Sequence, residues 1–129
     1  MIVVDASIIA DLLLGLGPTA AIRERLFGRR EPLHAPHIFD LEVLETLRKY
    51  RRDIGEERLR IAVESLHHVP IERHAHEPLL RRVWQLRDNI RAYDASYVAL
   101  AVLLGAPLVT RDGRLARSGG HGAAIELIA

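Results

Sequence analysis

The chain is predicted to fold as an α/β domain with a central, mostly parallel sheet of about 4-5 strands flanked by helices. Three observations predict this class. Short apolar runs rich in β-branched residues alternate with longer segments of helical pattern, and glycine or proline separates most of them. No repeat, linker or low-complexity stretch divides the sequence. Its 129 residues match the length of one ordinary domain, so we expect residues 1-129 to form a single domain.

The first half is predicted to contain two strands and four helices. Ile2–Val4 has the composition of a buried strand, and Ala6–Leu14 follows as a helix that ends at Gly15. Pro18 suits the first position of a second helix, which runs to about Phe27. The remaining elements of this half are a brief strand at Leu33–Ala35, a long helix at Ile38–Arg52 and, after Gly55, a helix at about Glu56–His67.

The second half is predicted to contain three strands and two helices. Val69–Glu72 is a strand, and Glu77–Arg87 is a helix. Asp94–Leu104 is apolar nearly all round, which indicates a buried helix. Leu108–Thr110 and Ile125–Ile128 are the last two strands, and we expect right-handed crossovers between the parallel strands.

The composition excludes several classes of site. There is no cysteine, so disulfides, thiolate zinc sites and cysteine nucleophiles are ruled out, as is common in a reducing cytosol. The longest apolar stretch, Ala95–Ala106, is too short to span a bilayer, and no secretory signal follows Met1. We therefore expect a cytoplasmic protein without a membrane partner. The formal net charge of +1 neither requires nor excludes a nucleic-acid partner.

Carboxylates follow two of the predicted strands. Asp5 comes directly after the first strand, and Asp112 follows Leu108–Thr110. Asp94 begins the buried helix that leads into that same strand. Ligands of open parallel sheets bind at the carboxyl ends of the strands, and acidic groups gathered there need a hard cation such as Mg²⁺. The arrangement indicates metal-dependent phosphodiester chemistry.

Each carboxylate also has a purely structural explanation. Asp5 and Asp94 precede helices and suit N-cap positions, and Asp112-Gly113 is a common turn pair. Glu42 lies on a polar stripe with Glu45 and its neighbours, which is typical of a solvent-facing helix surface unless the stripe lines a groove. Taken singly the structural explanations are favoured, whereas the joint arrangement favours a site.

Three segments together carry a family resemblance. They read MIVVDASIIADLLLG, HAPHIFDLEVLETLRK and NIRAYDASYVALAVLLGAPLVTRDGRLAR, and they span essentially the whole chain. In order and spacing the chain resembles the PIN-domain ribonucleases, and among them the VapC-type toxins of toxin–antitoxin pairs. The resemblance implies a single PIN domain and a metal-dependent endoribonuclease that hydrolyses RNA phosphodiester bonds.

The resemblance also implies roles for particular residues. Four of them match the acidic positions of the family and are here called the acidic set: Asp5, Glu42, Asp94 and Asp112. The three aspartates would hold Mg²⁺, or Mn²⁺ in its place, while the glutamate completes the shell or orients the attacking water. Supporting polar positions are matched by Ser7, Thr110 and Asn89. Arg111 departs from the usual small residue, and we expect it to contact a substrate phosphate or a carboxylate.

The resemblance implies three partners: a cognate VapB-type antitoxin, the RNA substrate and a second copy of the chain. Two other functions stay open at this point. One is a regulatory domain that binds metal, RNA or protein without cutting. The other is an aspartate-nucleophile phosphohydrolase using Asp5, which is disfavoured because Ser7 stands where a second aspartate is expected. The seven histidines lack the i, i+4 spacing of a helical zinc site and are interpreted as surface or loop residues.

Overall fold

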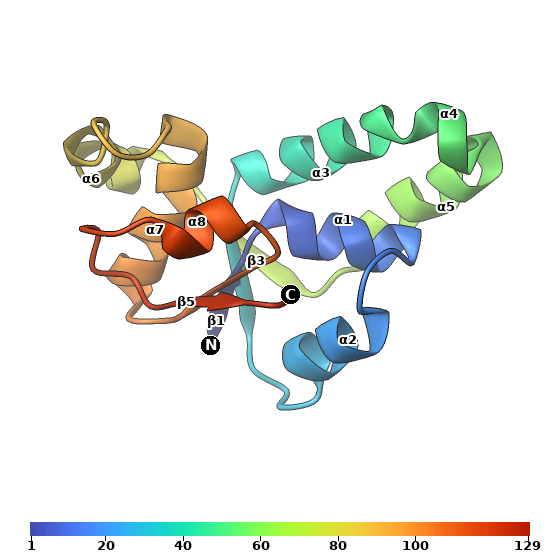
Figure 1. The fold of residues 1–129 in the computed structure, drawn as a ribbon, viewed down its shortest axis with the longest axis horizontal. Coiled ribbons are helices and arrows are strands. Elements are labelled where there is room, and N and C mark those ends of the chain that lie inside the picture. The colour runs from blue at the N-terminus through green and yellow to red at the C-terminus, as the bar shows by residue number, and fades with distance from the viewer.

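A five-stranded sheet forms the centre of the molecule in the computed structural model, which describes all 129 residues (Figure 1). The strand order is β3-β2-β1-β4-β5, and every neighbouring pair is parallel. The strands are β1 (Ile2–Val4), β2 (Leu33–Pro36), β3 (Ile71–His74), β4 (Leu108–Thr110) and β5 (Ile125–Leu127). The predicted fold class, an α/β domain with a parallel sheet, is confirmed.

Eight α-helices and one 3-10 turn connect the strands and pack around the sheet. They are α1 (Ala6–Leu14), α2 (Thr19–Phe27), α3 (Ile38–Lys49), α4 (Arg51–Ile54), α5 (Glu56–His67), the 3-10 turn η1 (Glu77–Leu79), α6 (Leu80–Gln85), α7 (Ala92–Leu104) and α8 (Gly113–Arg117). Helix α7 packs on β1, β2 and β4, while α1 contacts β4 and the helices α2, α3 and α5. None of these helices has the length and apolarity needed to cross a membrane.

The central strand marks a reversal in the winding. From β1 the chain moves outward through β2 and β3, and then returns to place β4 and β5 on the other side of β1. Right-handed crossovers in opposite directions put helices on opposite faces of the sheet. The connections from β1 and β4 therefore diverge, and a crevice forms at the carboxyl ends of these two strands.

Several boundaries follow the prediction closely. Strands β1 and β4 and helices α1 and α5 have the predicted bounds. Gly15 ends α1 in the left-handed conformation, with a φ of 68°, and its N–H bonds back to carbonyl oxygens of the last turn. Helix α7 is buried as predicted, although it begins at Ala92, so Asp94 lies inside its first turn and is not the N-cap.

Two boundary predictions are wrong for identifiable reasons. Strand β3 begins at Ile71, two residues later than predicted, because Pro70 has no N–H to donate to the ladder and Ile71 is the residue that pairs with Leu33. The long helix predicted to reach Arg52 breaks at Tyr50, whose N–H bonds to the carbonyl of Leu47 at 3.1 Å. That i to i−3 bond tightens the last turn of α3 before α4 starts.

Two further helical segments differ from the prediction. The helix predicted at Glu77–Arg87 consists of η1 followed by the shorter α6. Helix α8 was predicted only as a turn. It forms because the Asp112 side chain accepts a hydrogen bond from the N–H of Arg114 at 2.9 Å, which caps the helix.

Candidate active site

The acidic set gathers where β1 and β4 end. These strands are direct neighbours, with Val4 opposite Val109, so Asp5 and Asp112 emerge at the same edge of the sheet. Asp94 comes from α7, and Glu42 comes from α3. All four line one cleft of about 240 Å³, whose complete lining is Asp5, Ala6, Ser7, Asp11, Glu42, Glu45, Thr46, Lys49, Asp94 and Asp112.

Two hydroxyl groups fix the Asp5 carboxylate. Ser7 Oγ and Thr110 Oγ1 both donate to Asp5 Oδ2, at 2.8 Å and 2.7 Å. Each hydroxyl in turn accepts a backbone N–H from the end of β4, Ser7 from Arg111 at 3.2 Å and Thr110 from Asp112 at 2.9 Å. Since a backbone N–H can only donate, it leaves each hydroxyl proton directed at Asp5. The hydroxyls thus occupy Oδ2 and leave Oδ1 without a side-chain partner.

The carboxylates of the cleft differ in whether a cation pairs with them. Six carboxylates line it, and two have close arginine partners: Asp11 with Arg111 at 2.9 Å, and Glu45 with Arg48 at 2.7 Å. The other four are the acidic set. No lysine or arginine nitrogen comes closer to these four than 3.7 Å, the distance from Arg114 Nε to Asp112. Asp94 and Asp112 have only long ion pairs, with Arg91 at 3.9 Å and Arg114 at 3.7 Å, and Asp5 and Glu42 have no lysine or arginine partner.

Burial and mutual repulsion raise the pKa of Asp5, Glu42 and Asp94. Burial raises the pKa of Asp5, which is only 8% exposed, and the Thr110 and Ser7 hydrogen bonds offset part of that increase. Burial also raises the pKa of Glu42, and the charges of Asp5 and Asp94 add to it. Burial raises the pKa of Asp94, while the charge of Arg91 lowers it in part and the charge of Asp112 adds to the increase. Such a group of carboxylates favours a divalent cation over bulk water.

Tyr97 was not singled out from the sequence, yet its hydroxyl reaches the site. It is fully buried on α7, three residues after Asp94, and its hydroxyl donates to Glu42 Oε1 at 2.6 Å. Burial raises the pKa of Tyr97 far above its usual range, and the nearby Glu42 carboxylate raises it further, so the phenol stays a donor at all ordinary pH values. The hydrogen bond from Tyr97 thereby fixes the rotamer of Glu42, which lies on the polar stripe of α3.

A second, adjoining cleft extends the site toward α8. It has a volume of about 200 Å³ and shares Asp94 and Asp112 with the first cleft. Asn89 lines it and is exposed, so the structure places this predicted residue beside the site without direct contact to the acidic set. Arg91 and Arg114 line the same cleft and carry positive charge next to the acids.

Arg111 contacts a carboxylate, which is one of the two predicted alternatives. Its Nε donates to Asp11 at 2.9 Å, and its Nη1 donates to the carbonyl of Ile128 at 3.0 Å. Gly17 allows this arrangement. Its φ is +67°, and a Cβ there would lie 2.6 Å from Arg111 Nη2.

The interpretation of the histidines as surface or loop residues is wrong for two of the seven. His34 is buried in β2, and His74 lies in β3 and hydrogen-bonds through its ring to His34. Strand residues alternate between faces, so a search for helical spacing misses side chains that meet across two strands.

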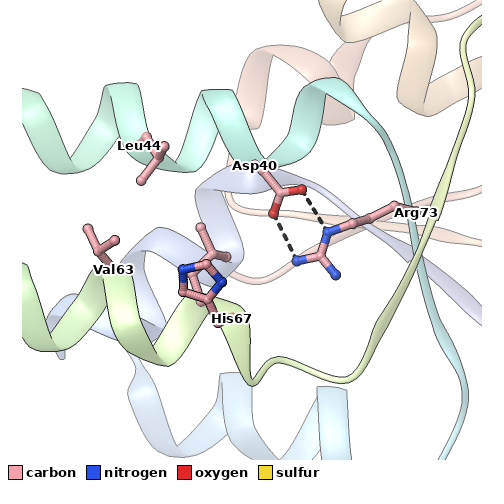
Figure 2. Close-up of a pocket in the computed structure, with 6 residues that line it drawn as sticks. Asp40, Leu44, Val63, His67 and Arg73 are labelled. Carbon is pink, nitrogen blue, oxygen red and sulfur yellow. Dashed lines mark hydrogen bonds and ion pairs between the residues drawn. The ribbon is translucent and has the colours of Figure 1, made fainter.

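Another cleft lies between α3 and α5 and differs in chemistry. Figure 2 shows Asp40 and Arg73 at one end of it, joined by two hydrogen bonds of 2.7 Å and 2.8 Å. The rest of the lining is mostly apolar, from Leu44 on α3 and Val63 on α5 (Figure 2). Because its one carboxylate is fully paired with an arginine, this cleft lacks the free acids that a hydrolytic site needs.

Comparison with known proteins agrees with this geometry. Residues 2–120 match the family described as "PIN domain". The chain belongs to the PIN-domain family. It is 43% identical to Ribonuclease VapC12 of Mycobacterium tuberculosis over the whole length of both chains, and 40% identical to Ribonuclease VapC1 of the same species over 98% and 96% of the two chains. This full-length likeness places it among the VapC ribonucleases, a class of nuclease and hence of hydrolase.

A solved structure gives the same PIN fold. The chain superposes on Mycobacterium tuberculosis VapC20, described as a sarcin-ricin loop cleaving toxin, with a TM-score of 0.65. The match has 18% identity and covers 90% of this chain and 93% of that one. At this identity the likeness shows the fold alone.

Proposed function

We propose that residues 1–129 act as one PIN domain that is a metal-dependent endoribonuclease and the toxin of a toxin–antitoxin pair. The observation that carries the proposal is the cleft in which four carboxylates gather: Asp5 and Glu42 have no cation partner, and Asp94 and Asp112 have only long ion pairs. The relatives named as ribonucleases support RNA as the substrate. No contact in the cleft favours a non-cleaving regulatory domain or a phosphohydrolase with Asp5 as its nucleophile.

The donor chemistry of the acidic set fits Mg²⁺ or Mn²⁺. Both ions take oxygen ligands, and Mg²⁺ keeps several waters and binds through one or two carboxylates. No three residues of the set bring one oxygen each within 4.8 Å of one another, which suits an ion held partly through water. Asp5, Asp94 and Asp112 would hold it. When bound, the ion lowers the pKa of a coordinated water and offsets the charge that develops on the phosphate.

The chain's own residues supply orientation and proton transfer. Ser7 and Thr110 hold Asp5 in one orientation, and Tyr97 holds Glu42 through Oε1. Glu42 Oε2 has no side-chain partner and is the group placed to accept a proton from the attacking water. Arg91 and Arg114, in the adjoining cleft, would bind the phosphates of the RNA backbone.

Cleavage assays on RNA test this function. We expect the purified protein to cut RNA in Mg²⁺ or Mn²⁺, to lose all cleavage in excess EDTA, and to regain it when Mg²⁺ is restored. The measurement is the appearance of discrete fragments from total RNA on a denaturing gel. Cleavage that persists in EDTA, or binding without cleavage in either metal, contradicts the proposal. A phosphorylated Asp5 trapped from a phosphate ester would support the phosphohydrolase instead.

The antitoxin partner has a surface of suitable chemistry. Helix α3 separates the acidic cleft, which it lines with Glu42 and Glu45, from the apolar cleft of Figure 2, which it lines with Leu44. An antitoxin segment could cover both clefts if it placed apolar side chains in the apolar cleft and a basic side chain in the acidic cleft. Location in the cytoplasm stays a prediction from the sequence.

A second copy of the chain is proposed to cover the apolar surface of α6 and the start of α7. Leu80, Trp84 and Tyr93 are each more than half exposed there, which is a large apolar patch for so small a protein. We expect light scattering at micromolar concentration to give twice the 14.5 kDa mass of one chain. Trp84→Glu should give the single-chain mass, whereas Phe27→Glu, on α2, should leave the dimer intact. A monomeric wild-type protein would rule this interface out.

A further inference from the structure

We propose that His34, Glu72 and His74 form a second cation site, apart from the acidic cleft, which takes a transition-metal ion of the Zn²⁺ type. His34 Nδ1 lies 2.8 Å from His74 Nε2 and 3.5 Å from Glu72 Oε2. One ligand atom from each of the three side chains lies within 4.8 Å of the other two. No other three histidine, aspartate or glutamate residues of the chain meet this condition.

Strand geometry brings the three side chains together. In the parallel pair β2 and β3, His34 stands directly opposite Glu72. Glu72 and His74 are two residues apart on β3, so they point to the same face of the sheet. The backbone pairing therefore holds all three ligands on one face of the edge strand β3, where the Glu72 side chain is exposed.

The two separations from His34 are compatible with tetrahedral coordination. Ligand atoms about 2.0–2.1 Å from a tetrahedral zinc ion lie about 3.3 Å from one another. The separation of His34 from Glu72 is already close to this value. The shorter separation of the two ring nitrogens is a hydrogen bond, and a cation would replace its proton and widen the pair by about 0.5 Å. Three protein ligands leave a fourth position for water on the exposed side of Glu72.

The ligand types distinguish this site from the acidic cleft. Two imidazole nitrogens and one carboxylate favour Zn²⁺, Co²⁺, Ni²⁺ or Cu²⁺, whereas the all-oxygen acidic set favours Mg²⁺ and Mn²⁺. A fourth histidine nearby does not contribute, because His76 Nε2 already accepts the N–H of Ile38 at 2.9 Å. The chain thus carries two sets of ligands that select different ions.

A cation here would join β3 to β2 close to the start of α3. The backbone N–H of His37, which follows β2, bonds to the carbonyl of His74 at 2.8 Å, and α3 begins at the next residue. Binding to the folded state alone raises stability by mass action. We therefore expect Zn²⁺ to stabilise the protein whether or not the acidic cleft is intact.

Binding of Zn²⁺ and Co²⁺ to untagged protein in excess Mg²⁺ tests the site. The excess Mg²⁺ occupies the acidic set and keeps Zn²⁺ from binding there. Competition with a chromophoric chelator then measures the affinity and stoichiometry of the Zn²⁺ that still binds. We expect one Zn²⁺ per chain, a visible Co²⁺ spectrum of four-coordinate type, and a rise in Tm of about 5 °C or more at saturating Zn²⁺. The assay uses no RNA, so its result does not depend on the proposed nuclease activity.

Variants at Glu72, which is exposed, and His74, which is half-buried, keep the test independent of folding. His74→Gln and Glu72→Gln should each weaken Zn²⁺ binding at least about 10-fold and remove the Co²⁺ spectrum. His68→Gln, an exposed histidine outside the cluster, should behave as wild type. Zn²⁺ affinity unchanged in His74→Gln, or lost only in Asp5→Asn, overturns the proposal, as does the absence of a Zn²⁺ site in the wild type.

Discussion

Asp5→Asn is expected to reduce RNA cleavage by more than about 10³-fold while making the metal-free protein more stable. The substitution removes a buried carboxylate that Asp94 repels, but the amide oxygen can still accept from Ser7 and Thr110. We expect the free energy of unfolding in EDTA to rise by about 0.5–2 kcal/mol at pH 7. Cleavage kinetics and urea denaturation measure the two effects.

The gain in stability should depend on pH in a definite direction. Because burial raises the pKa of Asp5 in the folded state, the folded protein binds that proton more tightly than the unfolded chain does. The carboxylate is therefore most destabilising above its folded pKa, and the penalty disappears as pH falls toward the ordinary value of 3.8. The stability difference between Asp5→Asn and wild type should shrink between pH 7 and pH 4.

Glu45→Gln is the matched control for Asp5→Asn. Glu45 lines the same cleft, but it pairs with Arg48 in an exposed ion pair. Because exposed pairs contribute little, we expect stability to change by less than about 1 kcal/mol and cleavage to stay near the wild-type rate. If Asp5→Asn retains cleavage, or if Glu45→Gln loses as much, the assignment of the acidic set is wrong.

Thr110→Val is expected to reduce cleavage by about 10-fold to 100-fold. Valine keeps the shape of the fully buried side chain but removes the donor to Asp5 and the acceptor for the Asp112 N–H. The unfolding free energy should fall by about 1–3 kcal/mol, because a buried polar group is left unpaired. Thr110→Ser, which keeps the hydroxyl, should recover most of the activity.

The pH profile separates a positioning role from a general loss of stability. The Thr110 hydrogen bond lowers the pKa of Asp5, so its removal should move the acid limb of the cleavage profile to higher pH. A merely structural defect would lower the rate without moving that limb. An unmoved profile, or a serine variant no more active than the valine variant, contradicts the positioning role.

The elements nearest the site were the easiest to predict. Strands β1 and β4 are buried on both faces, so they appear as continuous β-branched runs with a carboxylate soon after each. Boundaries set by pairing were harder. The start of β3 depends on its register with β2, and Pro70 is the one local signal against an earlier start.

The side-chain partners of the site were the least predictable part. Glu42 lies on a stripe that looks like a solvent face, and only the packing of α3 beside the sheet turns that stripe into the wall of a cleft. Tyr97 looks like an ordinary core residue of an apolar helix, since its partner lies 55 positions away. The same limit applies to His34, which meets His74 across 40 positions.

The bond between Thr110 and Asp5 joins residues 105 positions apart. A chain grows at about 5–20 residues per second, so roughly 5 to 20 seconds of synthesis separate these two residues. Until β4 has left the ribosome and paired with β1, Asp5 lacks the Thr110 hydroxyl, and Asp112 is not yet beside it. The candidate cleft is thus complete only after residue 112 has been synthesised and β4 has paired with β1, and we expect a chain terminated before β4 not to cut RNA.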